Sequence, residues 1–105
     1  MESFLYINDM LSEIGEIPSD SIVSKTLHKD EKMKVILFGF AAGQELSEHT
    51  AATPAILHFL HGEAKLILGG EAKEAKTGTW VHMPPHMPHT VQAQTPVIML
   101  LYLLT

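Results

Sequence analysis

Hydrophobic and polar residues alternate along most of the chain after residue 30, and glycine, proline or polar turns interrupt the alternation at short intervals. A period of two is typical of strands, because successive side chains of a strand point to opposite faces. The runs that match this pattern cover residues 21–27, 33–40, 46–49, 55–61, 64–68, 71–76, 80–83, 89–94 and 97–104. Strands repeated about every 8–12 residues favour an antiparallel sandwich or barrel. We therefore expect one all-β domain.

The first thirty residues follow a different pattern. Apolar residues between positions 7 and 14 recur three and four apart, which predicts one or two helical turns. Asn8 is placed to cap this short helix and Gly15 to end it, and Pro18 forces the chain out of any helix. We expect residues 1–30 to form an arm and the 21–27 strand, which pack on the barrel or on a partner, and residues 31–105 to form the barrel itself within one domain.

The last run, residues 97–104, is apolar on both faces. One face of a barrel strand lies in the core, so the other face needs a cover of its own. A second copy of the chain is the cover that we favour, which predicts a homodimer. The alternative is that residues 1–20 supply the cover.

Composition narrows the range of functions. The chain has 105 residues, enough for one domain, and it contains no cysteine, which excludes disulfides, thiolate zinc sites and cysteine nucleophiles. The formal net charge is −5 without any basic run, so nucleic acid and anionic membranes are not expected partners. No apolar stretch reaches the roughly 20 residues that span a bilayer, and the first residues lack the pattern of a signal peptide. We expect a cytoplasmic protein.

Histidine is unusually frequent towards the end of the chain. Five of the seven histidines lie in the second half: His58, His61, His82, His86 and His89. Prolines at 84, 85 and 88 rule out a helix that would bring the last three to one face. His58 and His61 are an odd number of positions apart on one strand, so they point to opposite faces. A histidine site must therefore join distant strands.

Two spaced motifs provide such a pair, and with them the chain resembles the cupins. The first cupin motif runs glycine, five residues, His-x-His, three or four residues, glutamate, six residues, glycine. Here Gly43 is followed by five residues and His49, and Gly62 stands at the closing glycine. The second motif runs glycine, five residues, Pro-x-Gly, two residues, histidine, three residues, asparagine; Gly78 and His89 match its first glycine and its histidine. The motifs span residues 43–93, about half the chain.

The resemblance implies a cupin-type double-stranded β-helix barrel and a candidate metal site. Metal-binding cupins hold one divalent ion with two histidines and a glutamate from the first motif and the histidine of the second. Residue by residue, His49 and His89 match two of these ligands, whereas Ala51 and Ala55 occupy the other two positions. The asparagine position is Ala93, and the glycine of Pro-x-Gly is replaced by His86. Stable metal sites normally have at least three protein ligands.

Strand parity predicts the remaining lining of the pocket. If His49 and His89 face inward, the residues at even spacing from them should do the same: Ser47, Ala51, Ala55, Leu57, Phe59, Val91 and Ala93. The predicted pocket is thus two imidazoles among small and apolar side chains. A third metal ligand could come from His86, His82, Gln44 or a bound substrate, with His86 the best placed of these.

Two classes of function remain open. The first is a binding module that holds a small organic ligand, with or without a loosely bound divalent ion. The second is a metal-dependent oxygenase or isomerase, with Fe, Mn, Ni or Zn held by His49 and His89. A metal-free isomerase with either histidine as base is a third alternative, although it lacks a partner carboxylate. We favour the binding module because alanines occupy two of the four metal-ligand positions.

Overall fold

The computed structural model describes residues 3–105, and nine strands form within that range. They follow the alternating runs of the sequence: β1 (Ile22–Lys29), β2 (Met33–Phe40), β3 (Glu45–His49), β4 (Ala55–His61), β5 (Ala64–Leu68), β6 (Glu71–Ala75), β7 (Trp80–Met83), β8 (His89–Ala93) and β9 (Val97–Leu104). The expected all-β class is confirmed. No helix within the described range is long and apolar enough to cross a membrane.

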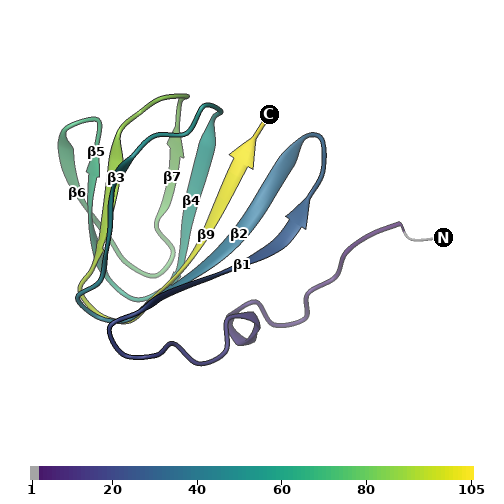
Figure 1. Ribbon diagram of the computed structural model, residues 1–105, viewed down its shortest axis with the longest axis horizontal. Coiled ribbons are helices and arrows are strands. Elements are labelled where there is room, and N and C mark those ends of the chain that lie inside the picture. Colours follow the sequence, from purple (N-terminus) through teal and green to yellow (C-terminus); the bar gives the residue numbers. More distant parts are fainter. Residues whose placement is uncertain (1–2) are drawn as a thin grey trace.

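The strands form two antiparallel sheets that face each other (Figure 1). One sheet has the order β1-β2-β9-β4-β7 and the other the order β3-β8-β5-β6. Strands distant in sequence are therefore neighbours, as where β9 lies between β2 and β4 and β8 lies between β3 and β5. This crossing of the chain between sheets brings the two histidine motifs together.

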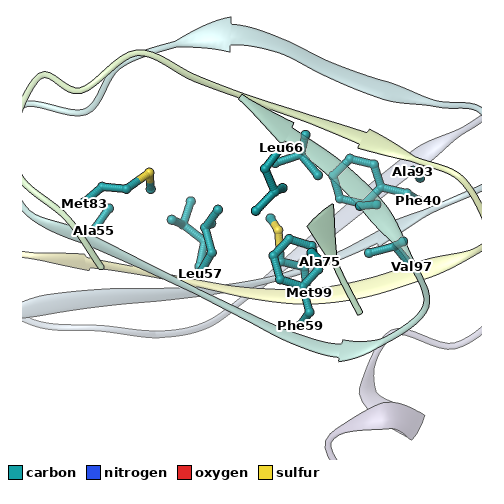
Figure 2. Packing of buried hydrophobic residues seen from close by; sticks show 13 residues of the cluster. Phe40, Ala55, Leu57, Phe59, Leu66, Ala75, Met83, Ala93, Val97 and Met99 are labelled. Carbon is teal, nitrogen blue, oxygen red and sulfur yellow. The ribbon is translucent and has the colours of Figure 1, made fainter. Parts of the chain in front are cut away.

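The main core lies between the two sheets. Its largest fully buried side chains include Phe40, Phe59, Leu66 and Met99, which come from both sheets. Figure 2 shows these side chains close together at one end of the core, whereas Ala55 and Met83 lie towards the other end. Large side chains thus fill one end of the barrel, and Ala55 lies beside Met83 near the opposite end.

A second apolar cluster covers the outer face of the five-stranded sheet. Val35, Leu37 and Leu100 are buried there, and Met10 and Ile14 of the N-terminal arm pack against them. Figure 1 shows the arm on the outer side of this sheet. The alternative cover, residues 1–20, therefore accounts for part of this face through Met10 and Ile14, and residues 1 and 2 lie outside the described range.

The N-terminal arm contains one short helical turn, at the lower end of the one or two turns expected. A single 3₁₀ turn forms at Leu11–Glu13, and the predicted Asn8 cap was wrong: the turn starts after Met10 without a side-chain cap. The Asn8 side-chain oxygen instead accepts a hydrogen bond from the Tyr6 hydroxyl at 3.2 Å. Gly15 follows the turn with φ of 68°, the left-handed conformation that commonly ends a helix.

Candidate functional site

The site begins with a pairing of two strand ends. His49 is the last residue of β3 and His89 the first of β8, and the two residues are direct cross-strand partners. Opposite residues of an antiparallel pair project to the same face with their Cβ atoms about 5 Å apart. The imidazole centroids are accordingly 4.1 Å apart, with the ring planes inclined at 58°. The fold therefore brings together the two histidines that the motifs singled out.

A β-bulge in β3 sets the direction of His49. Leu46 pairs with Val91 and His49 pairs with His89, so three steps on β3 oppose two steps on β8. An extra residue reverses the side-chain alternation, which lets Leu46 pack against the core while His49 still faces its partner. Ser47 is exposed as a result, although regular parity placed it in the pocket.

Both imidazoles are oriented by hydrogen bonds to backbone carbonyls. The Nδ1 atom of His49 lies 3.0 Å from the Ser47 carbonyl oxygen, and Nδ1 of His89 lies 3.0 Å from that of Met87. A carbonyl oxygen can only accept, so each Nδ1 must carry a proton and donate. In the neutral ring the other nitrogen, Nε2, then holds a lone pair.

His89 is almost wholly enclosed, with 4% of its surface exposed. Burial lowers the pKa of His89 below its ordinary value, the Met87 carbonyl opposes this change, and the nearby His49 charge adds to the lowering. The neutral imidazole is thereby favoured at neutral pH. Within residues 3–105 no buried side-chain nitrogen or oxygen is left without a partner, so the unbonded Nε2 of His89 must still reach open space.

That open space is a cavity of about 250 Å³ bordered by both histidines. Its lining residues are His49, Thr50, Ala51, Ala52, Thr53, Ala55, His89, Leu101 and Leu103. Ala51 and Ala55, where metal-binding cupins carry ligands, thus border this space. The walls are apolar apart from the two rings and two threonines. Drug-sized ligands occupy pockets of about 300–1,000 Å³, so this cavity suits something smaller.

Four other residues that parity assigned to the pocket lie deeper. Leu57, Phe59, Val91 and Ala93 are each at most 1% exposed and belong to the core between the sheets. Conversely, the sequence reasoning did not identify Thr50, Ala52, Thr53, Leu101 and Leu103 as lining residues. The alternation of the 97–104 strand could have indicated Leu101 and Leu103, whereas nothing in the pattern reveals how the 50–54 loop is placed.

His86 does not join the pair. Its side chain is exposed, and its backbone N–H donates to the Ala51 carbonyl at 2.7 Å. Its φ is 68°, in the left-handed region that favours glycine, which explains why the related motif has glycine here. His82 is exposed as well.

The residues present do not fit a complete resident metal site. In both rings Nδ1 bonds a backbone carbonyl and leaves Nε2 unbonded, which is the arrangement that metal-ligating histidines normally show. However, no group of three His, Cys, Asp or Glu side chains within residues 3–105 is arranged to hold an ion. The chain therefore offers two of the three or more protein ligands that stable sites usually have.

Comparisons with known proteins agree with this architecture. A family model described as the cupin domain matches residues 36–103. A conserved protein of unknown function from Streptococcus pyogenes has a similar solved structure, with 25% identity and a TM-score of 0.86 over 99% of this chain and 90% of that one. A cupin 2 conserved barrel domain protein from Leptotrichia buccalis is 31% identical, with a TM-score of 0.83, over 90% of this chain and 46% of its own.

An enzyme is also among the structural neighbours. The DMSP lyase DddQ from Ruegeria pomeroyi matches 82% of this chain and 48% of its own, with 19% identity and a TM-score of 0.75, which shows a shared fold alone. No curated protein sequence matches the chain. The family model covers most of the chain, and structures with the same barrel match nearly all of it. The chain belongs to the cupin family.

Proposed function

We propose that this cupin binds a small organic ligand in the cavity beside His49 and His89. One observation carries the proposal: two hydrogen-bond acceptors stand side by side at the wall of a cavity of about 250 Å³ whose other lining residues are apolar except for two threonines. Apolar walls with a few convergent polar groups are typical of small-molecule sites. The alanines at 51 and 55 keep this space open.

The proposal is tested by fragment screening with amide NMR shifts as the readout. We expect hits to perturb residues 49–55 and 101–103 together, and a His49→Ala change to weaken them. His61→Ala is the matched control, because His61 is an exposed residue at the far end of β4 and does not border this cavity. A screen whose hits perturb only the outer sheet faces would contradict the proposed site.

A metal-dependent oxygenase or isomerase is the second candidate. The carbonyl bonds that present both Nε2 atoms favour it, since ligating histidines usually donate their other nitrogen in this way. His49 and His89 would hold the ion, a bound substrate would supply the missing donors, and the ion would contribute Lewis acidity or oxygen activation. Elemental analysis after exposure to Fe(II), Mn(II), Ni(II) and Zn(II) tests it. Near-stoichiometric metal that is lost in His49→Ala would favour this candidate over the metal-free binding module.

We also propose that the protein forms a homodimer through the outer face of the five-stranded sheet. Trp80 on edge strand β7 is 58% exposed, and its cross-strand partner His58 is half-buried beside the apolar cluster of Leu100. The arm residues Met10 and Ile14 pack against the cluster around Val35, Leu37 and Leu100, away from edge strand β7. We infer that a second copy covers the part of this face at β4 and β7, where the Trp80 side chain is exposed.

A further inference from the structure

We propose that the cavity selects a small neutral molecule with a hydroxyl donor at one end and a one-ring apolar body, such as a phenol or a compact alcohol. This inference rests on the proposed binding function and specifies the chemical class of its ligand. Three features carry it: the hydrogen-bonding direction of the histidine pair, the absence of charge from the other lining residues, and the size and apolar character of the walls.

The histidine pair offers acceptors to the cavity. Both Nδ1 protons are already donated to the carbonyls of Ser47 and Met87. At a pH where imidazole is neutral, each ring therefore presents only an Nε2 lone pair, and the enclosed His89 keeps its Nε2 accessible. A ligand that meets these atoms must donate a hydrogen bond. An unpaired acceptor in such a site costs free energy, so a ligand without a donor binds less well.

The lining lacks a counter-charge for an ionised ligand. The seven basic residues of the chain are all lysines, at 25, 29, 32, 34, 65, 73 and 76, and none of them borders the cavity. No aspartate or glutamate borders it either, so an ammonium group would find no carboxylate. Transfer of a charged group into an apolar site without a partner is strongly unfavourable. Neutral ligands are therefore preferred over carboxylates and over amines.

The size of the cavity and the side chains of its walls determine the apolar part of the ligand. A cavity of roughly 150 Å³ lined by apolar side chains is enough to bind benzene. The cavity here holds about 250 Å³, so one ring with a short substituent fits, and a fused or extended molecule does not. Leu101 and Leu103 provide a wall for the ring, and the loop threonines Thr50 and Thr53 are the other side-chain polar groups on its border.

Three probes of nearly equal shape test the inference: phenol, toluene and benzoate. Each is titrated into chelator-treated protein at pH 8, where imidazoles are mostly neutral, with amide NMR shifts as the readout. We expect phenol to perturb residues 49–55 and 101–103. Toluene should bind about fivefold more weakly, the effect of one net hydrogen bond, and benzoate more weakly still.

Two variants assign the selectivity to the histidines. His49→Phe keeps a ring and removes one of the two acceptors, so it should weaken the preference for phenol over toluene, and the double variant His49→Phe/His89→Phe should abolish it. His49→Gln retains an acceptor and should restore part of that preference, and far-ultraviolet circular dichroism checks that each variant is folded. Benzoate binding as tightly as phenol, or a phenol preference that survives in the His49→Phe/His89→Phe double variant, would overturn the ligand class while the binding function stands. If none of the probes shifts the amide signals of the cavity residues, the ligand class is wrong. The fragment screen then tests the binding function separately.

Discussion

Gly62, which ends the first histidine motif, is the position where a single methyl group should be most damaging. It lies between β4 and β5 with φ of 96°. A Cβ atom there would lie 2.1 Å from the Pro96 carbonyl oxygen and 3.0 Å from Thr95 Oγ1. The neighbouring backbone cannot easily retreat, because Gln94 N–H donates to the Glu63 carbonyl at 2.9 Å. Gly62→Ala therefore combines backbone strain with a clash against backbone atoms.

Gly78, the first glycine of the second motif, is a matched control. It has the same φ of 96°, but nothing lies within 4 Å of a Cβ atom built there. Gly78→Ala should thus cost only the backbone strain, about 1–3 kcal/mol of unfolding free energy. Gly62→Ala should cost the same strain plus about 1–3 kcal/mol for forced displacement of packed atoms.

Urea unfolding measures the unfolding free energies of the two variants, and thermal unfolding measures their melting temperatures. If the clash adds about 2 kcal/mol, the melting temperature of Gly62→Ala should fall about 8–16 °C below that of Gly78→Ala, since 1 kcal/mol shifts a domain of this size by about 4–8 °C. Equal losses in the two variants would refute the reasoning, because φ alone would then account for the glycine at 62.

The other predictions concern pH, the arm and the dimer. The pKa of His89 is lowered in the folded protein, so the unfolded chain takes up the proton first as pH falls. The contribution of His89 to the free energy of unfolding should be fully present above about pH 6.5 and decline below it. Urea titrations from pH 8 to 5 should show less decline for His89→Phe. A Cβ atom at Gly39 would lie 2.9 Å from side-chain atoms of Ile14 and Ile17. Gly39→Val should therefore displace the arm and speed limited proteolysis near residue 14, with little loss of barrel stability. Unchanged cleavage would contradict the arm contact. Trp80→Ser should shift the protein towards monomer in light scattering at micromolar concentration, whereas a monomeric wild type would refute the dimer.

Much of the fold could be predicted because strand alternation and turn residues are local signals. Residues 97–104 and 55–61 were recognised as strands from their own composition, and the structure has strands at these positions. The pairing of His49 with His89 could be anticipated from the resemblance to the cupin motifs, whose histidines hold one ion together.

The rest depends on pairing that no local pattern encodes. The β-bulge between Leu46 and His49 exists only relative to β8, so parity along β3 alone misplaced Ser47. The loop after His49 borders the cavity because it crosses between the sheets, and a backbone hydrogen bond from His86 to Ala51 joins this loop to the one before β8. In each of these cases the arrangement depends on contacts between residues that are distant in the sequence.

The most direct test of the site is the tautomer of its two imidazoles. Long-range ¹H–¹⁵N correlation spectra at pH 8, assigned with His49→Phe and His89→Phe, report which ring nitrogen carries the proton. We predict that both rings are neutral, with the proton on Nδ1 and an unprotonated Nε2. Addition of phenol should shift the ¹⁵N resonance of Nε2. A proton on Nε2 of either ring would contradict the proposed acceptor pair.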